Sequence, residues 1–296
     1  MVIPVTQEIV TQSLYPGNTV SCAVFHEMVE KMEAALPLDT KEKRQFIRLR
    51  LDAGFGTDDN INFALWRGYH LLVKIYSTKR ARKLAHSVKE WVSVPSQANR
   101  TQRQAGWVTK PHRYSQQTLQ VAVRTKNEKG QWTYAVLVTT RLKASLAEIV
   151  TDYDHRSGVP ESTFCQDYQG LSVRKRRKGG FFAQQLLVLL SQLAHNLMVW
   201  TKSWLTSALA ESLLGGEEPP GESERKFIVL AIQTIQARGM KRFLHQILAL
   251  KGKVVFNGKK VEKIYLNPLY PFIARIQRAF EAFLKPYKIR VLLDEI

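Results

Sequence analysis

One segment, residues 46–76, limits what this chain can fold into more than any other. Its first residues, FIRLRL, predict a short strand that ends at Asp52, and YHLLVKIY at 69–76 predicts a second, buried strand. Between the two strands, Thr57 is in position to cap a helix that Gly68 ends. Consecutive strands joined through a helix are typical of a sheet with crossover connections, so the segment predicts an α/β fold.

The residues before this segment continue the same alternation. Residues 7–15, QEIVTQSLY, alternate weakly and predict a strand, PGNT at 16–19 predicts a turn, and 20–36 predict a helix. With residues 46–76 they give a strand–helix–strand–helix–strand run.

After residue 88 the pattern changes, and 90–142 are rich in Val, Thr, Trp, Tyr and Gln. Strands are predicted at 119–125 and 133–140, joined as a hairpin. Helical patterns then return, and a second hairpin is predicted with Asn257-Gly258 at its turn. The predicted regions are a partial core at 1–88, a β-rich insertion at 89–143, the rest of the core with two long helices at 144–214, a linker at 215–224, and a helical and hairpin region at 225–296.

The charge of the chain points to a polyanionic partner. Lys and Arg number 44 against 25 Asp and Glu, which gives a formal net charge of +19 and a pI near 10.0. Such a charge repels itself unless it meets a polyanion, and nucleic acid is the commonest one. A generally basic protein without a nucleic acid partner is the alternative.

Targeting features predict a cytoplasmic protein. Cys22 and Cys165 are the two cysteines, and they fit neither a disulfide framework nor a zinc site. The first residues lack the basic and apolar regions of a signal peptide. Residues 181–200 are about long enough to span a bilayer, but polar residues interrupt them, so a buried helix is the preferred interpretation and a membrane-associated protein the alternative. The interrupting residues are Gln184, Gln185, Ser191, Gln192, His195 and Asn196.

Two stretches together resemble a known family. LRLDAGFGTDDNINFALWRGYHLLVK resembles the strand that carries the second catalytic aspartate in insertion-sequence transposases of the DDE type, and LYPGNT resembles their third sheet strand. YDHRSGVPESTFCQDYQGLSVRKRRKGG resembles the helical region of their catalytic glutamate, which a Tyr–Arg–Glu–Lys signature marks. The matching residues are Tyr153, Arg156 and Glu161, and the resemblance covers most of residues 9–205.

This resemblance implies a fold, an activity and a site. The fold would be an incomplete ribonuclease-H-like core with a β-rich insertion and a helical C-terminal region. The activity would be metal-dependent DNA cleavage and strand transfer at insertion-sequence ends, with Asp52 and Glu161 as ligands of Mg²⁺ or Mn²⁺, which prefer oxygen donors. Arg156 would hold a phosphate, and Tyr153 would position it or contact DNA. The implied partners are double-stranded DNA of the transposon ends and target, and a second copy of the chain, in the bacterial nucleoid.

The sequence departs from the family pattern in its signature and at its start. Glu161 follows Arg156 by five residues where the family has four, and Tyr168 stands where the family has its Lys. Pro160 predicts a break after which Glu161 begins a new helix. Glu8 is the one carboxylate before the LYPGNT motif, where the family's first aspartate is expected. We therefore expect a truncated chain that is inactive alone, and a non-catalytic DNA-binding or dimer-forming remnant is the alternative.

Two basic clusters, TKRARK at 78–83 and VRKRRK at 173–178, are candidate phosphate contacts, with solvated surface as the alternative. Their residues are Lys79, Arg80, Arg82, Lys83, Arg174, Lys175, Arg176, Arg177 and Lys178.

Other residues have more ordinary interpretations. Asp58 and Asp59 are expected to offset a helix dipole rather than to bind metal, and His195 to be a core histidine. For Trp107, His112, Arg113 and Trp132 the sequence leaves open both contact with a DNA end and packing inside the sheet.

Overall fold

A computed structural model describes residues 1–95, 102–171, 179–214, 221–270 and 272–294, with the backbone alone at 156–162 and 164. The chain divides into two compact units. Unit 1 comprises residues 1–2 and 15–161, and unit 2 comprises residues 3–14 and 162–296.

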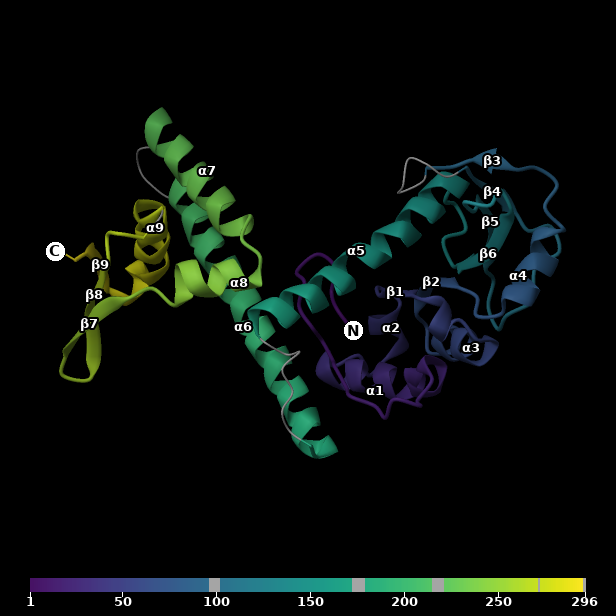
Figure 1. Ribbon diagram of the computed structural model, residues 1–296, viewed down its shortest axis with the longest axis horizontal. Coiled ribbons are helices and arrows are strands. Elements are labelled where there is room, and N and C mark those ends of the chain that lie inside the picture. The colour runs from purple at the N-terminus through teal and green to yellow at the C-terminus, as the bar shows by residue number, and fades with distance from the viewer. Residues whose placement is uncertain (96–101, 172–178, 215–220, 271, 295–296) are drawn as a thin grey trace. The chain divides into compact units, whose positions relative to one another are not determined.

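Unit 1 is a mixed α/β unit built on one six-stranded sheet, with strand order β1-β2-β6-β5-β4-β3 (Figure 1). Its strands are β1 (Arg48–Leu51), β2 (His70–Lys74), β3 (Val92–Ser93), β4 (Arg103–Trp107), β5 (Leu119–Lys126) and β6 (Trp132–Thr139). Its helices are η1 (Ser21–Val24), α1 (Phe25–Ala35), α2 (Lys41–Arg44), η2 (Ala53–Phe55), α3 (Asp58–Trp66), α4 (Thr78–Ala85) and most of α5 (Leu146–Gly170).

The segment at 46–76 folds as its sequence predicts. β1 and β2 pair in parallel, with Arg48 opposite His70 and Leu51 opposite Val73, and α3 is the crossover. The hydroxyl of Thr57 accepts a hydrogen bond from the backbone N–H of Asn60 and so caps α3. The α/β class predicted from this segment is therefore confirmed.

The first predicted strand is wrong, and the predicted β-rich block continues the sheet of β1 and β2. Residues 7–15 form no ladder with the sheet, and all of them except Tyr15 belong to unit 2, so the LYPGNT motif is not a strand, although its PGNT turn is present. Strand β6 pairs antiparallel with β2, with Leu72 opposite Thr139. The block predicted as an insertion at 89–143 therefore extends the same sheet as β1 and β2, because one backbone ladder runs through all six strands.

One face of this sheet packs against α5. The contact is made by Ile149 and Val150 of the helix with Leu72, Val121 and Leu137 of three neighbouring strands, and all five side chains are buried. The break expected at Pro160 is absent, because α5 continues as one helix of 25 residues. Proline inside a helix removes one backbone hydrogen bond, and α5 contains this defect without ending.

Unit 2 consists of a helical cluster and a small sheet. Its elements are α6 (Phe181–Leu214), α7 (Glu222–Gln236), α8 (Met240–Phe243), the π-helical η3 (Leu244–Leu248), β7 (Gly252–Asn257), β8 (Lys260–Leu266), α9 (Ile273–Leu284), η4 (Lys285–Tyr287) and β9 (Arg290–Leu293). Helices α6, α7 and α9 lie side by side around buried Leu205, Leu209, Ile228, Ile235 and Ile276 (Figure 1).

The predicted hairpin at the end of the chain is confirmed, and a third strand joins it. Gly258 has a φ of +61° and forms the two-residue turn with Lys259, one position later than the predicted Asn257-Gly258 turn, because Asn257 still pairs with Lys260. Strand β9 pairs in parallel with β8, a strand that the sequence analysis did not anticipate. Residues 215–220 of the predicted linker lie outside the described residues.

The polar residues of α6 bind the backbone of residues 3–14, which we call the N-terminal strap. The side chain of Asn196 accepts from the N–H of Ile9 at 2.9 Å and donates to its carbonyl at 2.9 Å. Gln192 donates to the carbonyls of Ile9 and Val10, and Gln185 accepts from the N–H of Leu14. These side chains take the place of a neighbouring strand, which explains the polar positions in an otherwise apolar helix.

His195 and Asp167 form a buried ion pair at the same helix. The Nδ1 of His195 lies 2.7 Å from a carboxylate oxygen of Asp167, and its Nε2 lies 2.9 Å from the carbonyl oxygen of Gln7. Both neighbours are acceptors, so both ring nitrogens carry protons. Burial alone would lower the pKa of His195, but the hydrogen bond to Asp167 and the attraction of its charge raise it above its ordinary value. The predicted core histidine is therefore confirmed, in its charged form.

The first half of α6 is less buried than predicted. Phe182 is 87% exposed and Leu186, Leu190 and Leu193 are each more than half exposed, because the strap covers the polar side of the helix and leaves these positions uncovered. Among the described residues, no helix is long and apolar enough to cross a membrane.

The His195–Asp167 pair makes stability depend on pH. Because the folded pKa of His195 lies above its unfolded value of about 6.5, its contribution is complete below that pH and is lost as pH rises through the folded pKa. Asp167→Asn should lower the free energy of unfolding by about 3 kcal/mol at pH 6 and flatten its decline above neutrality. Urea unfolding followed by circular dichroism at a series of pH values measures both.

A matched control is Glu222→Gln, which breaks the exposed ion pair with Lys226. Its unfolding profile should follow that of the unchanged chain within about 0.5 kcal/mol. An Asp167→Asn profile that still declines as steeply as the unchanged chain would exclude a charged His195.

Candidate functional site

Asp52 stands at the carboxyl end of β1, on the surface of unit 1. Its carboxylate accepts a hydrogen bond of 2.6 Å from the N–H of Ala53 and so begins the short helix η2. Gly56 follows, and a Cβ at Gly56 would come within 1.9 Å of the carbonyl oxygen of Lys74, so only glycine allows the turn to lie this close to the end of β2. The sequence therefore fixes the backbone beside Asp52 against the next strand.

The strand that carries Asp52 is the outermost strand of the sheet. Among the described residues β1 pairs with β2 alone. Its outer edge thus has backbone N–H and C=O groups without a ladder partner in this part of the chain.

Helix α5, which contains Tyr153, Arg156 and Glu161, is attached to β1 by ion pairs. Asp152 lies 2.9 Å from a guanidinium nitrogen of Arg48 and 3.3 Å from one of Arg50. The structure therefore connects the strand of Asp52 directly to the helix of Glu161.

The same helix has a second ionic attachment on the far side of the sheet. Asp154 accepts two hydrogen bonds from the guanidinium of Arg103 on β4, at 2.5 and 3.1 Å. Ion pairs to β1 and to β4 hold α5 across the face of the sheet, in addition to the apolar contacts beneath it.

The predicted signature residues have different surroundings. Tyr153 is half-buried and packs against the apolar core between α5 and the sheet, a position the sequence did not predict. The side chains of Arg156 and Glu161 lie outside the described residues. Within the described residues no group of three or more His, Cys, Asp or Glu is arranged to hold a metal ion.

The first basic cluster lies on α4, and its residues differ in their exposure and in their partners. Ala81 and Ala85 face the sheet and are buried, while Lys79, Arg82 and Lys83 are exposed. Arg80 is not available in the same way, because its guanidinium forms two hydrogen bonds with the carboxylate of Asp58. The second cluster, residues 174–178, lies outside the described residues.

Asp58 is the centre of a polar cluster that sequence analysis missed. Besides Arg80, it has His112 Nε2 at 3.5 Å, and its negative charge acts on the buried phenol of Tyr114. The hydrogen bond from Arg80 holds the pKa of Asp58 below its usual range, whereas burial and the nearby charge raise the pKa of Tyr114 to about 12. The acid therefore attaches the loop before β5 to α3 and α4. These residues lie far apart in the sequence, so no local pattern indicates that they form a cluster.

Aromatic residues of the β-rich block pack mainly with each other and with cations. The guanidinium of Arg124 lies between the rings of Trp91 and Trp132, 4.3 and 4.5 Å from their centroids. Trp132 thus forms the packing interaction that the sequence left open, while Trp107 remains 38% exposed. Cross-strand register could have revealed this pair, because Arg124 and Trp132 lie on one face of the β5–β6 hairpin.

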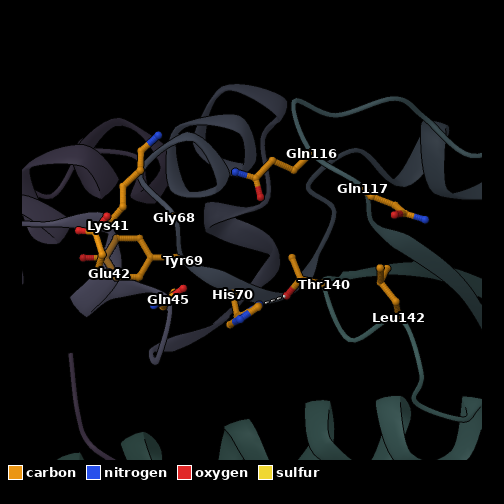
Figure 2. A pocket seen from close by; sticks show the side chains of 10 residues that line it. All are labelled: Lys41, Glu42, Gln45, Gly68, Tyr69, His70, Gln116, Gln117, Thr140 and Leu142. Carbon is orange, nitrogen blue, oxygen red and sulfur yellow. Dashed lines mark hydrogen bonds between the residues drawn. The ribbon is translucent and has the colours of Figure 1, made fainter.

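A cavity of about 460 Å³ lies at the start of β2, and Figure 2 shows the side chains that line it. The hydroxyl of Thr140 accepts from the N–H of Leu71 and hydrogen-bonds to the ring of His70. Because β1 and β2 are parallel, the start of β2 and Asp52 at the end of β1 are at opposite edges of the sheet. The cavity therefore takes no part in the candidate site. Its lining residues are Lys41, Glu42, Gln45, Gly68, Tyr69, His70, Gln116, Gln117, Thr140 and Leu142.

Comparison of the chain with models of protein families found no match, and comparison with curated proteins found none.

Arg80 and Arg82 of α4 should have different roles. We expect Arg80 to contribute to stability and Arg82 to DNA binding. Arg80→Gln should lower the free energy of unfolding by about 1 kcal/mol, because it breaks a two-pronged ion pair, while Arg82→Gln should leave stability unchanged. In return, Arg82→Gln should weaken binding to duplex DNA of any sequence. Thermal unfolding and fluorescence anisotropy on the two variants measure these effects, and equal destabilisation by both substitutions would contradict the assignment.

Proposed function

We propose that this chain is part of a DNA transposase of the DDE type with a ribonuclease-H-like core, in which Asp52 and Glu161 bind divalent ions. The observation that carries the proposal is the ionic attachment between the strand ending in Asp52 and the helix containing Glu161, made by Asp152 with Arg48 and Arg50. A two-metal site needs carboxylates far apart in sequence to be fixed on rigid elements of one unit.

The chemistry of the donors fits Mg²⁺ or Mn²⁺. Both residues offer carboxylate oxygens, and Asp52 is exposed at a strand end, where a DNA backbone has access. Bound ions of this kind would supply an activated attacking oxygen and a stabilised leaving oxygen. In this proposal Asp52 and Glu161 hold the ions, Arg156 binds a phosphate, and half-buried Tyr153 positions α5 rather than touching DNA.

Such a site requires a third carboxylate, and a strand that paired with the open edge of β1 could supply it. A strand that paired with this edge would place its own carboxyl end beside Asp52 if it ran parallel to β1. We propose that an acidic residue on such a strand completes the site. Without it, the chain binds DNA and does not cut it.

The charge supports DNA as the partner. The chain carries a net charge of +19, and Lys79, Arg82 and Lys83 are exposed on α4. Arginine and lysine side chains that are not paired with acids supply the sequence-independent part of DNA binding.

A second candidate function is that of a non-catalytic DNA-binding protein. It is favoured by the charge of the chain, because a net charge of +19 supports binding to DNA without a metal site. In that case Asp52 would only cap η2, as its hydrogen bond to Ala53 allows.

A transposition assay with the longest reading frame that encodes this chain distinguishes the two. The marker is placed between the element ends. Asp52→Asn should reduce transposition by more than about 100-fold, because a lost metal ligand costs more than a lost supporting residue. The control is Asp59→Asn, a largely exposed aspartate in the first turn of α3, which should retain activity within a few-fold. Equal activity of the Asp52 variant and the unchanged protein would exclude the transposase proposal.

A further inference from the structure

Three arginines of unit 1 converge on a single carboxylate. Nitrogens of Arg48, Arg50 and Arg141 lie 2.9, 3.3 and 3.2 Å from the oxygens of Asp152. The arginines come from β1 and from the turn after β6, and Asp152 comes from α5, so three separate elements supply the cluster.

The cluster has more positive charge than its acid neutralises. Three guanidinium groups face one carboxylate, so two of their positive charges have no acidic partner in contact within the part of the chain that the structure describes. Glu148 also attracts Arg141 from a distance, but its carboxylate accepts the N–H and hydroxyl of Ser145. The side chains of Arg48 and Arg141 are 35% and 38% exposed, so an incoming anion has access to both.

Other arginines of the unit do not have this excess. Arg103 pairs one-to-one with Asp154, and Arg80 with Asp58. Arg44, which lies near Glu33, donates to three backbone carbonyls and is thereby satisfied. Among the described residues, by contrast, the side chains of Arg48 and Arg141 have Asp152 as their one acceptor.

The cluster and Asp52 lie on the same face of β1, toward opposite ends of the strand. Side chains alternate along β1, so Arg48 and Arg50 share one face of the strand while Leu49 and Leu51 are buried on the other. Continuing the alternation, Asp52 follows on the same face as the arginines. Its Cα lies about 13 Å from that of Arg48, at about 3.3 Å per residue.

We propose that Arg48, Arg50 and Arg141 form a binding site for the backbone phosphates of DNA, with Asp152 holding the three guanidinium groups in position. This inference rests on the proposed function for its choice of DNA. A guanidinium group can donate two parallel hydrogen bonds to two oxygens of a phosphate. A cluster with more arginines than acids is stabilised by a bound anion, which neutralises the excess positive charge. The site would bind phosphates of the same DNA strand that passes Asp52, farther along its backbone.

The test measures binding of a fluorescein-labelled DNA duplex by anisotropy over a range of salt, in EDTA so that no cleavage can occur. In the double variant Arg48→Gln/Arg141→Gln, the slope of log K against log salt should fall by between about 1 and 2, since each lost phosphate contact removes about 0.9. Affinity at about 0.1 M salt should fall at least tenfold. Arg50 is left in place because it also binds the backbone carbonyl of Asp152.

Two further variants keep the result interpretable. The control Arg278→Gln/Arg290→Gln removes the same charge from arginines that pair with Glu224 and Glu262, and its slope should stay near that of the unchanged chain. Arg48→Lys/Arg141→Lys keeps the charge and should recover most of the slope, even if the Gln variant folds poorly.

The outcomes separate this inference from the proposed function. Loss of slope in the Gln pair alone supports the site, whether or not the protein cleaves DNA. Equal slopes in the two Gln pairs overturn it while leaving DNA binding intact, and an unchanged chain that does not bind duplex overturns the proposed function. Replacing chloride by inorganic phosphate at equal ionic strength should displace no more DNA. Displacement by millimolar phosphate would assign the cluster to free phosphate instead.

Discussion

The carboxylate of Asp152 is the interaction on which the arrangement of unit 1 depends. It joins α5 to the edge strand β1 through Arg48 and Arg50, and to the turn after β6 through Arg141. Apolar contacts beneath the helix provide most of the burial but little direction, because burial is non-directional. The ion pairs with β1 and β4 determine how the helix lies across the sheet. A carboxylate surrounded by arginines is also costly to remove, because it leaves several cations partly buried.

Local patterns in the sequence predicted the elements that local interactions form. The strand–helix–strand segment at 46–76, the cap at Thr57 and both hairpins all follow from residues within a few positions of each other. The predicted strand at 7–15 failed for the same reason. Its weak alternation does not specify a partner, and side chains of α6, about 180 positions later, bind its backbone instead.

The candidate site could be predicted only in part. Asp52 at a strand end is visible in the sequence because Gly54 and Gly56 follow it. The cluster around Asp152 is not, because its arginines are separated from it by up to 104 positions and only the sheet register brings them together. Arg80 shows the opposite error: it was grouped with exposed neighbours as a DNA contact, yet the fold pairs it with Asp58, 22 positions away. Whether a basic residue of such a cluster can contact DNA thus depends on whether the fold pairs it with an acid.

The central claim, that Asp52 and Glu161 bind one pair of divalent ions, can be tested by replacing Mg²⁺ with Fe²⁺ in the presence of ascorbate and peroxide. Hydroxyl radicals formed at the bound iron cut the backbone nearby, and the fragments are identified by mass spectrometry. The account predicts cuts near both residues, with both sets lost in Asp52→Asn and retained in Asp59→Asn. Cuts confined to one of the two segments, or cuts near Glu161 that persist in Asp52→Asn, would contradict it.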